Sequence, residues 1–181
     1  RDKTRDRFAQ GPFYIGLAIC YYNLGKLPEG NENLEIAVKN KDKFPTPDEA
    51  VASGIQAMVV AAVAKKDEQA IIDFISKNRG DILGAPFEMA RYSNIYLKAA
   101  AQTVNSGMPA AGFAIYQLIP SVEESIAGIR ARINALGPLR MVRDGVKTIE
   151  KDRLEADLKV LETQRNGKGS ADAKRLKGVA A

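Results

Sequence analysis

The feature that most constrains this chain is an apolar pattern with helical spacing, interrupted at regular intervals by short polar turns. The clearest example follows the i, i+3, i+4, i+7 rhythm of one helix face, at Tyr14, Leu17, Ala18, Tyr21 and Leu24. Gly25 comes next and can adopt the left-handed conformation that ends a helix, and Pro28 can open a second helix. No segment alternates as a half-buried strand would, so the sequence predicts an all-α fold.

Three such helix pairs align with one another. Their turns fall at Gly25, Lys65 and Gly107, at nearly equal intervals along the chain. A small residue follows five positions later, and a large apolar residue follows four positions after that. The small residues are Gly30, Ala70 and Gly112, and the large ones are Leu34, Phe74 and Tyr116. Because a single pair cannot bury its own apolar face, repeated pairs are expected to stack.

This pattern resembles the tetratricopeptide repeat, in which Leu-Gly, Tyr, Ala and Phe recur at fixed spacing. The first pair carries the resemblance best, through Tyr14, Leu17, Ala18, Tyr21, Gly25, Gly30, Leu34 and Ala37. The interval between pairs exceeds the spacing that is usual in that family, and we attribute the excess to longer links between pairs. The resemblance implies an α-solenoid of about three antiparallel helix pairs, followed by a long C-terminal helix.

The chain is expected to divide into three parts. Residues 1–10 read as the end of a preceding helix, 11–120 as the tetratricopeptide-like helical repeats, and 121–181 as basic C-terminal helices that cap the array or form an interaction segment. In the last part, Ser121 is placed to cap a helix running to about Leu136, and a long charged helix is predicted from Leu139 to Thr163.

The resemblance also implies a function, because members of that family generally bind peptides or helices of partner proteins in a concave groove lined by the first helix of each pair. Projected onto this chain, the groove is unusually apolar. The predicted partner-binding residues are Ile15, Ile19, Tyr22, Asn23, Ile55, Val59, Asn94, Leu97, Ala101 and Asn105.

An exposed apolar strip of this length should be covered. One candidate is an amphipathic helix or peptide of a partner protein. Another is the predicted helix from Leu139 to Thr163, which could instead pair with a second copy of the chain to form a homo-oligomer. The sequence leaves these alternatives open.

Chemically reactive residues are scarce. The chain has no His and a single cysteine, Cys20, which we expect to be a small core residue. Catalytic triads and cysteine–histidine zinc sites that need these residues are therefore excluded. We predict that the protein is not an enzyme and that it uses no catalytic residue, metal or cofactor.

The alternative function is binding of nucleic acid or an anionic surface through the C-terminal helices. Residues 129–181 hold 13 basic and 7 acidic groups. The basic groups that could form a phosphate-binding stripe are Arg130, Arg132, Arg140, Arg143, Lys147, Lys151 and Arg153. Interspersed acidic residues and the lack of aromatic platforms favour protein as the partner.

The sequence contains no apolar run of about 18 residues, so it predicts no membrane span. It begins at Arg1 in a charged segment, and we expect a piece of a longer protein or a processed form. It does not indicate a compartment.

Overall fold

The computed structural model describes residues 3–41, 46–137 and 145–166, except for the side chains of 3–11, Phe87, Gln164 and Asn166. Within these ranges the chain forms eight α-helices and no strand, which confirms the predicted all-α class. None of these helices combines the length and apolar character needed to cross a membrane. The helices are α1 (Lys3–Asn23), α2 (Leu27–Lys39), α3 (Pro47–Lys65), α4 (Glu68–Ile82), α5 (Pro86–Asn105), α6 (Pro109–Tyr116), α7 (Val122–Leu136) and α8 (Gly145–Asn166).

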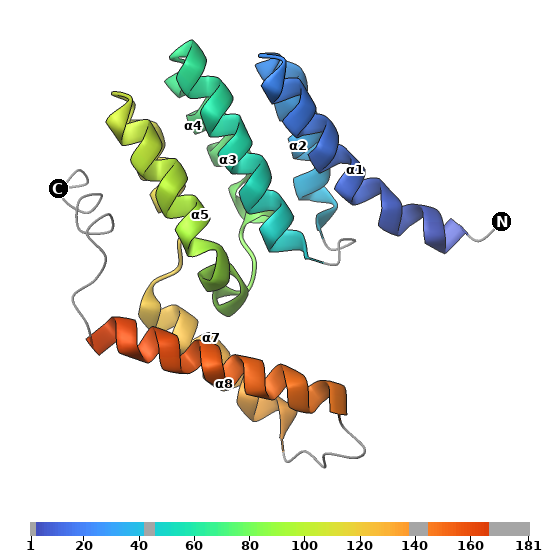
Figure 1. The fold of residues 1–181 in the computed structure, drawn as a ribbon, viewed down its shortest axis with the longest axis vertical. Coiled ribbons are helices and arrows are strands. Elements are labelled where there is room, and N and C mark those ends of the chain that lie inside the picture. Colours follow the sequence, from blue (N-terminus) through green and yellow to red (C-terminus); the bar gives the residue numbers. More distant parts are fainter. Residues whose placement is uncertain (1–2, 42–45, 138–144, 167–181) are drawn as a thin grey trace.

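The first six helices form two layers. Helices α1, α3 and α5 lie side by side in one layer, and α2 and α4 lie behind them (Figure 1). Each helix of the first layer packs on the helix that follows it, and α4 packs on both α2 and α6. Consecutive helix pairs are therefore neighbours in space as well as in sequence.

The turns that join α1 to α2, α3 to α4 and α5 to α6 share one backbone geometry. Each contains a residue with positive φ, which is 70° at Gly25, 57° at Lys66 and 81° at Gly107. The N–H of the following residue donates to the carbonyl five positions back, which closes a Schellman motif. These bonds join Lys26 to Tyr21 at 2.8 Å, Asp67 to Ala62 at 3.0 Å, and Met108 to Thr103 at 2.9 Å.

The structure corrects the predicted position of the second turn by one residue. Lys66, not Lys65, occupies the left-handed position, and it lies midway in the sequence between Gly25 and Gly107, so the turns are equally spaced. Asp67 then caps α4, because its carboxylate accepts a hydrogen bond from the N–H of Ala70 at 3.0 Å. One residue corresponds to about 100° of rotation around a helix, so the correction changes which side of α3 faces the core.

A continuous apolar core runs through these hairpins. Its largest fully buried side chains include Leu34, Ile55, Met58, Tyr96 and Ile115. Glycines allow close approach within the first and third hairpins. A Cβ at Gly30 would lie less than 3.0 Å from the ring of Tyr22, and one at Gly112 would lie 3.0 Å from the carbonyl oxygen of Ala100.

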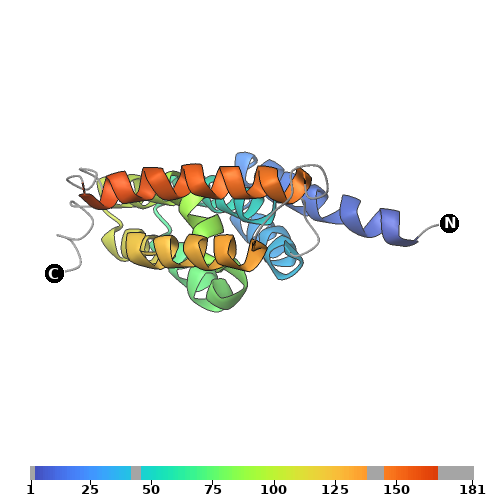
Figure 2. The same cartoon turned by 90° about the horizontal axis from the view of Figure 1, so that it is seen from below.

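The last two helices form a pair of their own across one end of the two layers (Figures 1 and 2). Ser121 caps α7 as predicted, in a capping box with Glu124: the Ser121 N–H donates to Glu124 Oε2 at 2.8 Å, and the Glu124 N–H donates to Ser121 Oγ at 3.1 Å. Hydrogen bonds from Ser121 hold the pKa of Glu124 below its usual range. Helix α7 packs on both α5 and α8.

Two predicted boundaries fall at α1 and α8. Residues 3–10 lie in α1, which runs without a break from Lys3 to Asn23. The long charged helix predicted from Leu139 begins at Gly145 within the described residues, and Leu139 lies outside them.

Candidate protein-interaction face

Helices α1, α3 and α5 have accessible residues at equivalent positions. The equal interval between the turns relates these positions to one another. We call them the outer face, which consists of Pro12, Ser53 and Asn94, then Ile19, Val60 and Ala101, then Asn23, Ala64 and Asn105. All nine are exposed or half-buried, and Val60 is 51% exposed.

Six of the ten predicted partner-binding residues keep accessible side chains. Asn23, Asn94 and Asn105 are exposed. Ile19, Leu97 and Ala101 are half-buried. These residues come from α1 and α5, so the structure brings the first and third predicted groups together on one layer.

The other four predicted residues are buried, which contradicts their expected place on an exposed apolar strip. They are Ile15, Tyr22, Ile55 and Val59. In α1, Ile15 and Tyr22 pack toward Gly54 and Gly30, and the Tyr22 hydroxyl donates to Asn31 Oδ1 at 2.9 Å. In α3, Ile55 and Val59 are fully buried because the register of this helix differs by one residue from the predicted one.

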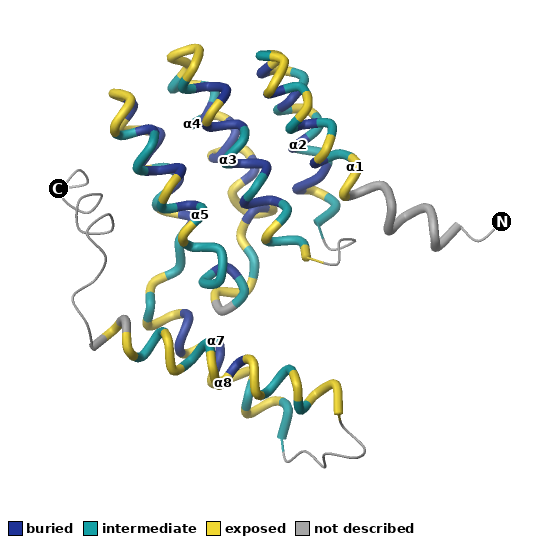
Figure 3. Tube along the Cα trace, in the orientation of Figure 1, coloured by how far each residue is buried: buried dark blue, intermediate teal, exposed yellow. Residues whose placement is uncertain are grey.

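The corrected register replaces the missing α3 residues with others that the sequence analysis did not select. Ser53, Gln56 and Val60 are accessible at these positions of α3. Figure 3 shows that buried, half-buried and exposed stretches alternate along this helix. The outer face is therefore more polar than predicted. Asp67 is the signal that could have located them, because an N-cap there places the second turn midway between the first and the third.

The C-terminal helix does not cover the outer face. Helix α8 packs on α7 at the end of the layers, and it meets α5 through Arg91, whose guanidinium lies 2.6 Å from the carboxylate of Asp157. Val60, Asn23 and Asn105 stay exposed in its presence. Among the described residues, the C-terminal helix therefore does not cover the predicted apolar strip, which was one of the two alternatives.

Burial between the helices shifts the pKa values of two tyrosines and one lysine. Burial raises the pKa of the Tyr22 and Tyr96 hydroxyls well above their usual value. Burial also lowers the pKa of Lys41, whose ammonium donates to the carbonyls of Ile82 at 2.9 Å and Leu83 at 2.7 Å. Lys41 thus binds the carbonyl end of α4, where a cation is favoured by the helix dipole.

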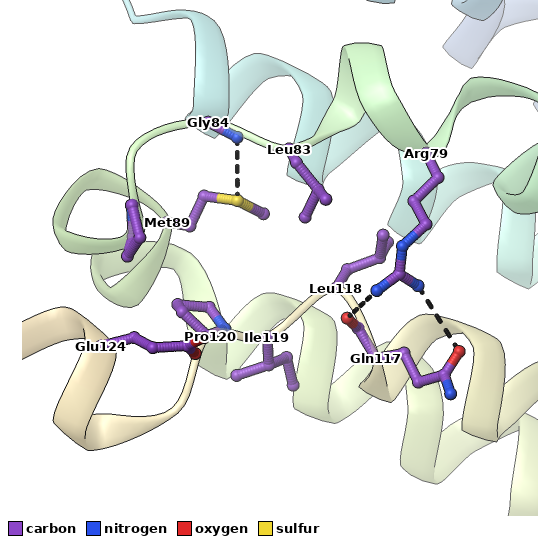
Figure 4. Close-up of a pocket in the computed structure, with 10 residues that line it drawn as sticks. Arg79, Leu83, Gly84, Met89, Gln117, Leu118, Ile119, Pro120 and Glu124 are labelled. Carbon is purple, nitrogen blue, oxygen red and sulfur yellow. Dashed lines mark hydrogen bonds between the residues drawn. The ribbon is translucent and has the colours of Figure 1, made fainter.

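No group of three or more Cys, Asp or Glu residues in the described part of the chain could hold a metal ion. Cys20 is exposed on α1, so its prediction as a core residue is wrong. An open cleft of about 220 Å³ lies where α4 ends and the α6–α7 link begins, but its polar groups are already engaged: Arg79 donates to the Gln117 carbonyl at 3.2 Å, and Glu124 caps α7 (Figure 4).

The basic groups considered for nucleic-acid binding are partly neutralised. Arg130 pairs with Glu162 at 2.7 Å, and Arg132 pairs with Glu150 at 2.7 Å. Lys151 lies 3.8 Å from Glu155. The side chains of Arg140 and Arg143 lie outside the described residues.

Comparison with known proteins adds no relative to this description. The chain matches no protein-family model, no curated protein and no solved structure.

Proposed function

We propose that this chain is a tetratricopeptide-like array of helical hairpins that serves as a protein-binding scaffold. The observation that carries the proposal is the shared Schellman turn at Gly25, Lys66 and Gly107, at equal spacing. Equally spaced turns divide the first six helices into three consecutive pairs, and α3 packs on both α1 and α5. This regularity is typical of repeat arrays, whose extended surfaces bind other proteins.

The outer face is the proposed binding surface. It offers apolar contacts at Ile19 and Val60 and amide groups at Asn23, Asn94 and Asn105. Asn side chains both donate and accept hydrogen bonds, so they can pair with the backbone of a bound segment. A peptide or amphipathic helix with alternating apolar and polar groups is the partner that fits this mixture best.

The charges favour protein over nucleic acid as that partner. Three of the basic groups that could contact phosphate are paired with carboxylates within the C-terminal helices, at Arg130, Arg132 and Lys151. A phosphate backbone would have to displace these pairs. Steep weakening of binding with added salt would indicate the nucleic-acid alternative, since counterion release dominates such complexes.

Affinity capture with matched variants tests the proposal. Ile19→Glu combined with Val60→Glu places two charges on the outer face, where neither side chain is fully buried. Phe113→Glu is the control, because Phe113 is an exposed apolar residue on α6, in the other layer. We expect a bound protein to be retained by the parent chain and by the control and to be lost from the double variant.

Circular dichroism must first show that all three chains have the same helix content. If a partner binds all three equally, the outer face is not its site. If short DNA or RNA displaces the bound protein from the parent chain and from the Phe113→Glu control alike, the nucleic-acid alternative replaces the proposal.

A further inference from the structure

Helix α8 carries two apolar faces, of which only one is packed. On the inner face, Leu154 is fully buried, and Leu158 and Leu161 are half-buried against the rest of the pair. On the outer side, Val146 is 83% exposed, Ile149 is 70% exposed and Val160 is 57% exposed. Several large apolar side chains exposed on one helix indicate an interaction surface.

The exposed residues follow a heptad pattern. The α8 seam consists of Val146, Ile149, Arg153, Ala156, Val160 and Thr163, separated alternately by three and four residues. All six are exposed. This alternation is the a/d spacing of a coiled coil, in which each apolar residue enters a gap on a facing helix. The seam is separate from the outer face of α1, α3 and α5.

We propose that the α8 seam is a homodimer interface, in which it packs antiparallel against the α8 seam of a second copy of this chain. A two-fold axis between Arg153 and Ala156 brings Ile149 opposite Val160 of the second copy. The same axis brings Arg153 opposite Ala156, whose small side chain leaves room for the arginine. Each contact occurs twice, as a two-fold symmetric interface requires.

The charges beside the seam match this arrangement. Along one edge lie Asp152 and Lys159, both exposed and without an ion pair in the described part of the chain. Antiparallel packing sets Asp152 of each copy beside Lys159 of the other, which forms two attractive pairs. Along the other edge, Glu150 and Asp157 would meet as like charges.

That second edge is already neutralised within each chain. Arg132 lies 2.7 Å from Glu150, and Arg91 lies 2.6 Å from Asp157. The two carboxylates therefore carry their own counterions into the interface. Asp152 and Lys159, which have no ion pair in the described part of the chain, thus attract each other across the two-fold axis.

Parallel packing is disfavoured by the same residues. It would place the two Arg153 side chains opposite each other, which is a like-charge contact. It would also set Asp152 beside Asp157, whose charge Arg91 already balances, so Asp152 and Lys159 would lose their mutual attraction. Both effects favour the antiparallel orientation.

The seam is short, so the dimer is expected to be weak. From Val146 to Thr163 the helix extends about 27 Å. This is about two and a half heptads, whereas a stable isolated coiled coil needs at least three to four. Because α7 already holds α8 in helical form, a dissociation constant on the order of micromolar is expected.

Sedimentation velocity of the full chain over a range of concentrations, from about 1 to 500 μM around the expected micromolar constant, measures this association. Asp152→Lys turns both attractive pairs into repulsive ones, and it should raise the dissociation constant at least about tenfold. The double variant Asp152→Lys with Lys159→Asp restores opposite charges and should restore the dimer. Ile149→Asp should abolish it, while circular dichroism shows unchanged helix content because the side chain is exposed.

Disulfide crosslinking tests the orientation. In a Cys20→Ser background, chains carrying Ile149→Cys are mixed with chains carrying Val160→Cys. Antiparallel packing predicts rapid crosslinks between the two kinds of chain and none between two Ile149→Cys chains, since bridged residues must have Cα atoms within about 7 Å.

Three outcomes would overturn the proposal. A chain that stays monomeric throughout this concentration range has no such interface, even if another protein or nucleic acid occupies the seam. A dimer that is indifferent to Asp152→Lys and Ile149→Asp uses another surface. Crosslinks between two Ile149→Cys chains would show parallel packing.

Discussion

Gly30→Ala tests how closely α1 and α2 approach each other. A Cβ at position 30 would lie less than 3.0 Å from the Cδ1, Cε1 and Cζ atoms of Tyr22, a distance that real side chains do not adopt. The Tyr22 ring is 4% exposed, and its hydroxyl is bonded to Asn31, so it has little room to move. The substitution must therefore displace a packed ring or separate the two helices.

The expected magnitude follows from opposing terms. Replacing Gly with Ala inside a helix is worth about 1 kcal/mol in favour of folding. Overpacking a core costs about 1–3 kcal/mol, and weakening the bond from Tyr22 to Asn31 adds about 1 kcal/mol. The net effect of Gly30→Ala is a loss of about 1–3 kcal/mol of unfolding free energy. For a chain of this size that corresponds to a Tm lower by about 5 °C.

Thermal unfolding followed by circular dichroism measures this change, with Gly16→Ala as the matched control. Nothing lies within 4 Å of a Cβ at Gly16, so this variant should gain about 0.5–1 kcal/mol. Combining Gly30→Ala with Tyr22→Ala removes the ring and should make the added methyl group neutral or stabilising. The reasoning is refuted if Gly30→Ala raises Tm as much as Gly16→Ala does.

Three further predictions address the register, the buried hydroxyls and the C-terminal pair. Val59→Asp places a charge at a fully buried site, so it should unfold the chain or lower its Tm by more than about 10 °C. Val60→Asp should leave the Tm within about 2 °C of the parent value, as measured by the same melts. Equal effects of the two substitutions would contradict the observed register of α3. The pKa values of the Tyr22 and Tyr96 hydroxyls are raised in the folded state, so the stability that their neutral forms contribute is complete below about pH 10 and is lost as the pH rises above it. The Tyr96→Phe variant lacks one of these hydroxyls, so its alkaline unfolding, followed by tyrosine absorbance, should occur at higher pH. At neutral pH the same variant should be as stable as the parent or more so, since this hydroxyl has no hydrogen-bond partner in the described structure. Arg91→Ala removes the ion pair with Asp157 that joins α5 to α8, and it should speed proteolytic cleavage before α8 while the Tm of the first six helices stays nearly constant.

Much of the helical architecture could be predicted from the sequence because local signals agree with one another. Gly25 occupies the left-handed position predicted for it, Gly107 lies at a predicted turn, and Ser121 caps α7 as expected. Of the residues predicted on α1 and α5, Leu24 was expected on the apolar face but is 71% exposed, and Ile15 and Tyr22 were expected in the groove but are buried. In these helices a glycine fixes the turn, so the periodic pattern has a fixed starting point.

Helix α3 could not be placed in the same way. Between Val51 and Ala64 it is apolar on nearly every side, so its periodicity does not show which face points inward. Its turn lacks glycine and uses Lys66 in the left-handed conformation. The sequence pattern therefore could not reveal that the register of α3 differs by one residue. Because of this difference, Val60 and not Val59 lies on the outer face.

The sequence by itself determined that this chain is helical, where most of its helices turn, and that it lacks the residues for His-dependent catalysis. Those properties depend on local conformational preference and on which side chains are present. Only the tertiary structure decided which apolar residues are core and which are surface: it buried Ile55, exposed Cys20, and left the outer side of α8 unpacked. The physical reason is that burial is set by which neighbour a face meets, and an apolar side chain has the same local preferences whether that neighbour is another helix of the chain or water.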